Sequence, residues 1–474
     1  MSFSTKKLVS FGAILVVVFG CAYLFMYKIQ KASPKSTATT QRSASGNSTP
    51  VKVTKREVKP CGTESGEGCA LTEKRVDLVA PVFSHSTKID NPLYPVSSLK
   101  SSVFIGLVDD LPFRTETTLL PKTRIINVNG APIETLEYQY MAFSGGRLQE
   151  IAKDWFAQDD AGNVWYLGED VADYNETGRI FTHEGTWLAG VDNAPISMIM
   201  AAHPKVGDVW QAEDTAPEAW EEITVKETGL SLIGPSGPIA NAIIGSELHM
   251  DGTRQQKIFA PGYGEFQTGS RENNDLEALA LSIPTDAQAD SLPAELKNLS
   301  TQTATLYNAV RGRDFTSMNT ALTRVSSEWS NYKASNVVSP LLANEVERIF
   351  PLLRKAASAK NTFETALHAV ELARPIYDLR LRYQPIPEID QVRFDLWMAQ
   401  VPVDAERGDA GSLRGDVASA SLVLDRFVHT LDGSLASRIH VKLDELTSVA
   451  DKDDLNRSVT LASEIRGLLP TGWK

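Results

Sequence analysis

The chain has few cysteines, because Cys21, Cys61 and Cys69 are the only three among its 474 residues. Three cysteines are too few for a disulfide-dense scaffold or a four-cysteine zinc site. The sequence also lacks a P-loop, a Gly-x-Ser-x-Gly elbow, a paired-histidine zinc motif and a Cys-x-x-Cys motif. No common catalytic signature therefore marks an enzyme, and no cofactor is indicated.

Positive charge is scarce in the part of the chain that is expected to fold. Residues 1–60 carry ten Lys and Arg and one acid, Glu57, which gives a net charge of +9. The other 414 residues carry 37 Lys and Arg against 58 Asp and Glu, which gives −21. A nucleic-acid surface needs clustered positive charge, so we expect no nucleic-acid partner.

One long apolar run lies near the N-terminus. Residues 8–27 contain no charge, and a helix of that length spans about 30 Å, the thickness of the hydrocarbon core. We interpret residues 1–31 as a transmembrane signal anchor that holds the chain in an inner membrane, because a cleavable signal has a shorter apolar stretch. Cleavage around Gly20, or lipidation at Cys21, is the alternative.

Residues 32–79 are interpreted as a disordered linker that carries a cysteine pair. Its first part is rich in Ser and Thr and poor in apolar residues, so it cannot bury enough surface to fold. Cys61 and Cys69 bracket a short loop with three glycines. A local disulfide there requires an oxidising compartment, whereas two reduced, unrelated cysteines are the alternative. The disulfide interpretation places the bulk of the chain outside the inner membrane, in a periplasm.

Residues 80–285 are predicted to form a β-rich unit. Short aromatic and β-branched runs alternate there with Gly, Asn, Asp and Pro, and Leu136, Tyr138, Tyr140 and Ala142 alternate with polar neighbours. This period of two is typical of a half-buried strand. Turn signals recur too closely for crossover helices. The pattern therefore predicts an antiparallel sheet that is curled or closed into a partial barrel.

Five runs in this unit carry a resemblance to a known family. They are IDNPLYPV, DWFAQDDAGNVWYLGEDV, HEGTWLAGVDNAPISMIM, HPKVGDVW and IFAPGYGEF, in that order, between about residues 89 and 266. In this region the chain resembles a family of bacterial secreted or membrane-attached proteins that are largely uncharacterised and share a Trp-Tyr-x-Gly-Glu-Asp strand. The resemblance implies a β-rich fold and assigns no catalytic residue.

Acidic residues and histidines of the β-rich unit are the candidates for chemistry. Glu169, Asp170 and His183 would form a metal site or the acid/base pair of a hydrolase if they face the same side of the sheet. Solvated strand ends are the alternative interpretation. His249 is a further metal candidate, and a metal-handling protein would use His183, His203 or His249 with neighbouring acids.

The aromatic side chains of the same unit suggest a ligand cup. A curled sheet would let such rings line a concave site, whereas rings that fill the core are the alternative. The candidate cup residues are Tyr138, Tyr140, Trp155, Trp165 and Trp187.

Residues 290–474 are predicted to be helical. Apolar residues recur there at spacings of three and four, as in Met318, Leu322 and Val325, which is typical of amphipathic helices. Asp314 and Asp409 begin similar stripes, so we expect an internal repeat over about 293–385 and 388–470, or one array of about eight helices. Such arrays commonly present surfaces to other proteins.

Together these features predict an α+β multidomain protein with an N-terminal transmembrane helix. We interpret it as a non-enzymatic, membrane-anchored extracytoplasmic binding or scaffold protein with a protein partner at the helical unit. A periplasmic metal-handling protein and a hydrolase are the alternatives.

Overall fold

The computed structural model describes residues 50–270 and 275–473. The expected membrane-spanning segment 8–27 and Cys21 lie outside these ranges. Within them, none of the helices combines the length and the apolar character that crossing a bilayer requires.

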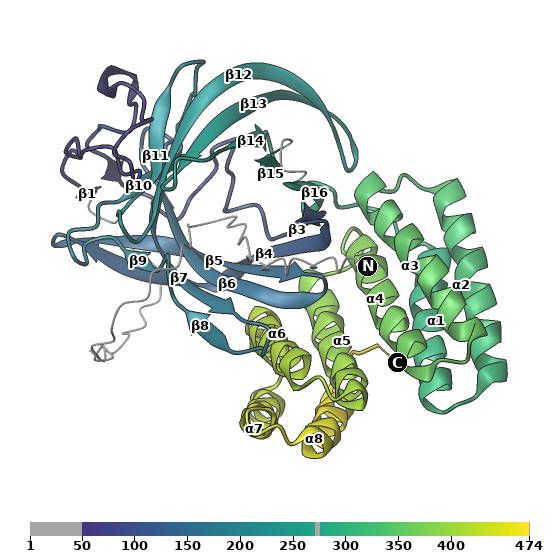
Figure 1. Cartoon of the computed structure of the whole chain (residues 1–474). Coiled ribbons are helices and arrows are strands. Elements are labelled where there is room, and N and C mark those ends of the chain that lie inside the picture. The colour runs from purple at the N-terminus through teal and green to yellow at the C-terminus, as the bar shows by residue number, and fades with distance from the viewer. Residues whose placement is uncertain (1–49, 271–274, 474) are drawn as a thin grey trace, which may run out of the picture.

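A large antiparallel sheet precedes eight helices in the described chain, which confirms the expected α+β arrangement (Figure 1). The strands of the sheet lie in the order β10-β7-β6-β5-β4-β3-β16-β15-β14-β13-β12-β11, and β8 and β9 pair with β7. Their bounds are β3 Ser101–Val108, β4 Leu111–Val128, β5 Ala131–Ser144, β6 Arg147–Gln158, β7 Val164–Tyr174, β8 Ile180–Thr182, β9 Trp187–Leu188, β10 Ser197–Met200, β11 Val209–Asp214, β12 Trp220–Gly234, β13 Gly237–His249, β14 Arg254–Ala260, β15 Gly264–Ser270 and β16 Asp275–Ile283. A second, two-stranded sheet joins β1 Val51–Lys52 and β2 Val82–Phe83.

Local turn chemistry explains how neighbouring strands reverse. Between β6 and β7, Asp159 Oδ1 accepts hydrogen bonds from the backbone N–H groups of Ala161 and Asn163. Gly162 adopts φ 91° in this turn, a conformation that costs a glycine little. The turn sets the register up to Phe156 opposite Tyr166, and a β-bulge then shifts it by one residue, so that Asp154 of β6 stands opposite Glu169 of β7.

The large sheet is strongly curled. Its two end strands, β10 and β11, contact each other even though they stand at opposite ends of the strand order. A sheet that curls in this way has a concave face, on which every second side chain of each strand points inward. The curl therefore brings residues of β7 close to residues of β11 and β12.

Eight α-helices follow the sheet. Their bounds are α1 Ala294–Arg311, α2 Phe315–Ser335, α3 Pro340–Ser358, α4 Thr362–Arg380, α5 Ile386–Arg407, α6 Ala410–Phe427, α7 Gly433–Ala450 and α8 Leu455–Leu468. The side chains of Asp314 and Asp409 cap α2 and α6, and those of Asn361 and Asp454 cap α4 and α8. The two predicted repeats thus correspond to α1–α4 and α5–α8, and a common origin stays a prediction.

Both helix sets pack against the sheet through apolar side chains. Val103, Leu281 and Ile283 of the sheet share a core with α1–α4. Met141 and Phe143 share another with α5–α8. Figure 1 shows α5 and α6 beneath β6, with α1–α4 on the side of β16.

Buried ion pairs join the same surfaces. Arg114 Nη1 of β4 lies 2.7 Å from Asp378 Oδ2 of α4. Arg426 Nη1 of α6 lies 2.8 Å from Glu116 Oε2 of β4. Such pairs require a defined geometry, because an unpaired charge in the same place would be costly. The sheet and the helices are therefore held in one arrangement.

The segment from residue 50 onward differs from the expected disordered linker, because it packs on the sheet. Arg56 is buried, and its guanidinium lies 2.6 Å from both Asp77 Oδ2 and Asp214 Oδ2. Composition does not reveal this, since a single buried, doubly paired arginine anchors a segment that is otherwise polar.

Candidate functional site

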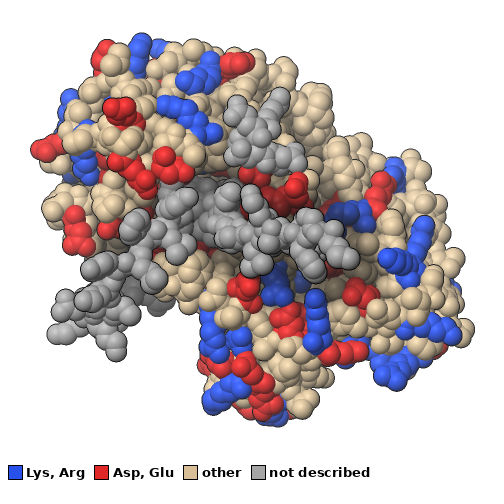
Figure 2. All heavy atoms as spheres, viewed as in Figure 1, with Lys and Arg blue, Asp and Glu red and all other residues tan. Residues whose placement is uncertain are grey.

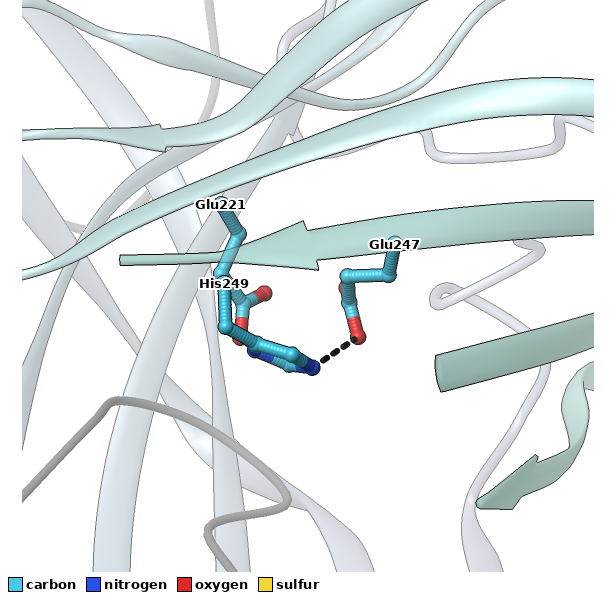
Figure 3. Close-up of side chains that lie close together, drawn as sticks. All are labelled: Glu221, Glu247 and His249. Carbon is cyan, nitrogen blue, oxygen red and sulfur yellow. Dashed lines mark ion pairs between the residues drawn. The ribbon is translucent and has the colours of Figure 1, made fainter. Parts of the chain in front are cut away.

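The concave face of the sheet carries a row of ionisable side chains. Glu213 of β11 stands opposite Glu221 of β12, and Glu221 stands opposite His249 of β13. Glu247 precedes His249 by two residues and therefore faces the same side. All four residues are buried, and Figure 3 shows Glu221, Glu247 and His249 converging.

His249 lies between two carboxyl groups. Its Nδ1 is 3.3 Å from Glu221 Oε1, and its Nε2 is 3.7 Å from Glu247 Oε2 (Figure 3). The ligand atoms of these three residues all lie within 4.8 Å of one another. The arrangement is therefore suited to holding either a proton or a metal ion.

Lys257 of β14 is the buried cation of this face. Its Nζ lies 2.8 Å from Glu247 Oε1, and Gln255 Nε2 donates a 2.7 Å hydrogen bond to Glu247 Oε2. Both oxygens of Glu247 therefore have a partner. Burial lowers the pKa of Lys257, but the charges of Glu247 and Glu265 outweigh it and raise that pKa well above its usual range.

The ionisation of the glutamates is uneven. Burial raises the pKa of Glu213, and the charge of Glu221 raises it further, to about 8. Burial also raises the pKa of Glu247. For Glu221, burial acts in the same direction, but Lys257 and His249 outweigh it and lower the pKa. Negative charge thus concentrates on Glu221, whereas Glu213 and Glu247 bind protons near neutral pH.

Glu169 belongs to this group because the sheet curls. It lies on β7, and its pKa is raised well above the usual range by burial and then by the charge of Glu213. The carboxyl groups of Glu169 and Glu213 contact each other, and apart from that contact neither has a hydrogen-bond donor among the described residues. The structure therefore brings Glu169 and His249, two of the sequence-predicted metal candidates, to the same concave face.

The other two candidates lie elsewhere. Asp170 is exposed and adjoins Glu169 on β7, so it points to the opposite face of the strand. His183 follows β8, and its Nδ1 lies 2.6 Å from the carbonyl oxygen of Val171. The structure therefore does not assemble Glu169, Asp170 and His183 into one site.

The aromatic cup candidates are all buried. Tyr138 and Tyr140 line a cavity of about 60 Å³ together with Asp154 and Glu277. Trp155 Nε1 donates to Glu137 Oε2 and Trp165 Nε1 donates to Asp159 Oδ2. Trp187 packs edge-to-face on Tyr166 at 5.3 Å between ring centroids. The structure thus brings Tyr138 and Tyr140 to one small cavity and leaves the three tryptophans in separate packing positions.

A larger pocket of about 340 Å³ lies between the sheet and the helices. Its volume is within the range of small-molecule sites, which are frequent at such interfaces. Apolar walls come from Phe113, Phe143 and Leu148 of the sheet and from Leu367 and Trp397 of the helices. The pocket therefore has room and apolar surface for the body of an organic ligand.

Arg374 of α4 is a half-buried charged group of this pocket, whereas Arg407, which also lines it, is exposed. Its guanidinium carbon lies 3.5 Å from the centroid of the Trp397 ring of α5. Among the described residues it makes no ion pair and no hydrogen bond. Burial lowers the pKa of Arg374 to about 10, and Arg114 acts in the same direction, although Asp416 opposes both. Its positive charge is therefore incompletely compensated.

Two carboxyl groups lie at the same pocket. Asp404 and Asp416 are buried and line it. Burial raises the pKa of Asp416 well above the usual range, and the charge of Asp404 adds to this effect. Burial therefore disfavours the charged form of Asp416, which weakens the compensation of the Arg374 charge.

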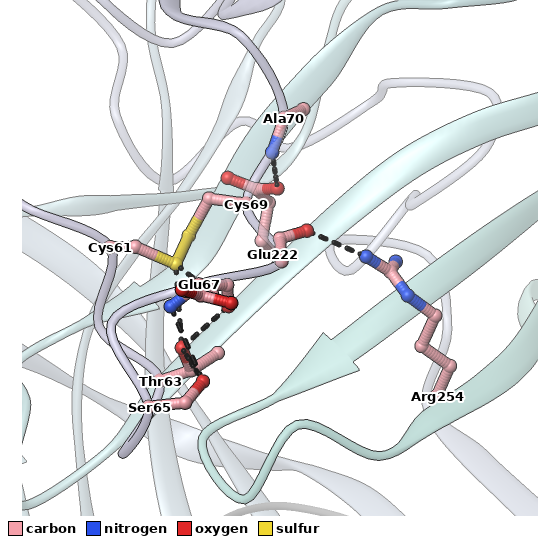
Figure 4. Close-up of a disulfide and its surroundings, with 9 residues drawn as sticks. Cys61, Thr63, Ser65, Glu67, Cys69, Ala70, Glu222 and Arg254 are labelled. Atoms are coloured by element: carbon pink, nitrogen blue, oxygen red, sulfur yellow. Dashed lines mark hydrogen bonds between the residues drawn. A yellow bond between two sulfur atoms is a disulfide. The ribbon is translucent and has the colours of Figure 1, made fainter.

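The disulfide loop lies on the outside of the sheet. The structure joins Cys61 and Cys69 in a disulfide (Figure 4). Inside the loop, Thr63 Oγ1 donates a 2.7 Å hydrogen bond to the carbonyl of Glu67. Directly after it, the backbone N–H of Ala70 donates to Glu222 Oε1 of β12 at 2.8 Å. The end of the disulfide loop therefore contacts β12 on the face of the strand opposite to the one that carries Glu221.

Sequence reasoning missed Glu213, Glu221, Lys257 and Arg374. The period of two within residues 245–249 identifies the shared face of Glu247 and His249, but only strand register adds Glu213 and Glu221. Comparison of the chain with known family models, curated proteins and solved structures finds no match.

Proposed function

We propose that this chain is a membrane-attached extracytoplasmic binding protein whose ligand is a small organic carboxylate with an apolar body. The observation that carries the ligand assignment is Arg374, which lies over Trp397 in the 340 Å³ pocket without an anionic partner among the described residues. The ligand carboxylate would meet the guanidinium, and its apolar body would contact the surrounding rings.

The chemistry of arginine supports this ligand class. A guanidinium that stacks on an aromatic ring keeps its N–H groups free in its own plane, where they match the two oxygens of a carboxylate. A hydrogen bond to a charged group contributes about 1.5–3 kcal/mol. The bound anion would also supply negative charge beside Arg374, where burial disfavours the charged form of Asp416.

The cellular location rests on other features. The apolar run 8–27 supports attachment to an inner membrane. The bond between Cys61 and Cys69 and the resemblance of residues 89–266 to bacterial secreted or membrane-attached proteins support an extracytoplasmic position.

The helical part of the chain, α1–α8, would bind the protein partner. On the face in Figure 2, Lys and Arg are interspersed with Asp and Glu over the helices. This mixture favours a partner with both signs of charge rather than a uniformly basic one.

The test compares carboxylates with neutral analogues of the same shape. Octanoate and benzoate serve as probes, octanamide and benzamide as controls, and binding to the full chain in detergent is measured by calorimetry. We expect the carboxylates to bind and the amides to bind at least tenfold more weakly. Arg374→Gln should weaken carboxylate binding at least tenfold, since it removes the charge-assisted hydrogen bonds.

Arg348→Gln is the matched control variant. Arg348 lines the same pocket, but its Nη2 already lies 2.6 Å from Glu345 Oε1. Its loss should change carboxylate affinity less than threefold. Absence of carboxylate binding, or equal binding by wild type and Arg374→Gln, would contradict the proposed function.

A further inference from the structure

The concave face of the sheet holds many more buried acids than buried bases. The buried acids on this face include Glu150, Asp154, Glu169, Asp173, Glu213, Glu221, Glu247 and Glu277, whereas the buried bases among the described residues are His249 and Lys257. Uncompensated charge is costly in a protein interior, so such a surplus requires either bound protons or a bound cation.

We propose that the row Glu213–Glu221–His249, together with Glu247, binds a divalent transition-metal ion such as Zn²⁺ or Mn²⁺. Glu221, Glu247 and His249 each offer a ligand atom, and these atoms lie within 4.8 Å of one another (Figure 3). A metal bonds to carboxylate oxygen and imidazole nitrogen at about 2.0–2.2 Å. The 3.7 Å between His249 Nε2 and Glu247 Oε2 therefore leaves room for an ion between them.

Glu213 and Glu169 give independent support for a cation. Glu213 is fully buried and stands directly opposite Glu221, so its carboxyl group is directed to the same row. Apart from the contact between their own carboxyl groups, Glu213 and Glu169 have no hydrogen-bond donor among the described residues. Two buried carboxyl groups that contact only each other require a shared proton or a bound cation.

The ligand types narrow the choice of metal. An imidazole nitrogen favours Zn²⁺, Fe²⁺ or Cu²⁺, and carboxylates are shared by Zn²⁺, Mn²⁺, Mg²⁺ and Ca²⁺. One histidine among three carboxylates therefore favours Zn²⁺, which both ligand types suit, and then Mn²⁺, because the carboxylates dominate; Ca²⁺ and Mg²⁺ prefer oxygen ligands alone.

Lys257 is the resident competitor for this site. Its Nζ lies 2.8 Å from Glu247 Oε1, so a metal ion and the ammonium group draw on the same carboxylate. Substitution of Lys257 by a neutral residue of similar length should therefore strengthen metal binding. A variant that only disturbed the fold would weaken metal binding. Tighter binding by the Lys257 variant would therefore indicate competition between the ammonium group and the metal ion.

The experiment measures metal binding to the full chain in detergent after treatment with EDTA. Calorimetry and native mass spectrometry with ZnCl₂ and MnCl₂ should show one bound ion per chain, with CaCl₂ and MgCl₂ at least tenfold weaker. His249→Gln and Glu213→Gln should each weaken Zn²⁺ binding at least tenfold, whereas Lys257→Met should tighten it. Circular dichroism confirms that each variant is folded.

Glu277→Gln is the matched control, because Glu277 is a buried glutamate of the same face that bonds to Thr115 rather than to the row. Its Zn²⁺ affinity should equal that of the wild type. The proposal is overturned if the wild type retains no metal, or if His249→Gln and Glu277→Gln bind Zn²⁺ equally. It does not depend on the carboxylate pocket, so either result leaves that proposal to its own test.

Discussion

Glu213 and Glu221 stand directly opposite each other on β11 and β12, with both carboxyl groups buried on the concave face of the sheet. Like charges in this position destabilise a sheet, and burial increases the cost of ionising either one. The pair therefore contributes a local instability that a proton or a cation relieves.

Removal of one carboxyl group should stabilise the metal-free protein. With EDTA present at pH 7, we expect Glu213→Gln to raise the free energy of unfolding by about 1 kcal/mol or more, because glutamine neither ionises nor has to take up a proton on folding, as the buried Glu213 must. Urea denaturation measures this change. Glu227→Gln is the control, since Glu227 is exposed on the neighbouring strand β12 and should change stability by less than about 0.5 kcal/mol. A destabilised Glu213→Gln would count against charge repulsion in this pair.

The buried acids should also make stability fall as pH rises. Burial raises the pKa of Glu277 from 4.5 to about 8 and that of Asp154 from 3.8 to about 7. A folded state with raised carboxyl pKa values binds more protons than the unfolded state, so its stability is fully present below about pH 4 and is lost as pH rises through about 7 and 8.

Urea denaturation between pH 4 and pH 9 checks this dependence. The unfolding free energy of the wild type should decrease across this window, with each unit of pKa displacement contributing about 1.4 kcal/mol. Glu277→Gln should show a shallower decrease, because it removes one of the titrating groups. A wild type whose stability is flat or rises over the window would refute the assignment.

The sequence predicts the class of the fold better than it predicts the sites. Alternating residues such as Tyr138 and Tyr140 identify strands, and spacings of three and four identify helices, because both patterns are local. The meeting of Glu169 with Glu213 depends on the curl that brings the two ends of the sheet together. No local pattern encodes that contact.

The pocket between the sheet and the helices was missed for a related reason. Arg374 and Trp397 each occupy ordinary helix positions, and only the packing of α4 on α5 stacks one on the other. The buried Arg56 is similar, since its two aspartate partners lie 21 and 158 residues away. Long-range ion pairs of this kind need the fold before they can be identified.

The ion pairs between the sheet and the helices should contribute strongly to stability. Arg426 is fully buried, donates to Gln139 Oε1 at 2.6 Å and lies 2.8 Å from Glu116 Oε2. Arg426→Met leaves Glu116 with a weaker set of partners, so we expect the unfolding free energy to fall by about 3–5 kcal/mol. Guanidinium denaturation measures the loss. Arg457→Met, which breaks the exposed pair with Glu445, should cost less than about 1 kcal/mol. Equal effects of the two variants would contradict the structural role of Arg426.

The disulfide offers a test of both stability and cellular location. The bond closes a loop of eight residues in sequence separation, and the chain-entropy account gives about 2–3 kcal/mol for a loop of this size. The double variant Cys61→Ser with Cys69→Ser should lose up to this amount of unfolding free energy, and the wild type under reducing conditions should be destabilised to the same extent.

In cells, an extracytoplasmic chain should resist maleimide labelling at Cys61 and Cys69 until it is reduced, because the bond persists only in an oxidising compartment. Mass spectrometry of the peptides that contain Cys61 and Cys69 shows whether each cysteine is labelled before and after reduction. Free thiols at both positions before reduction would place this part of the chain in a reducing compartment instead.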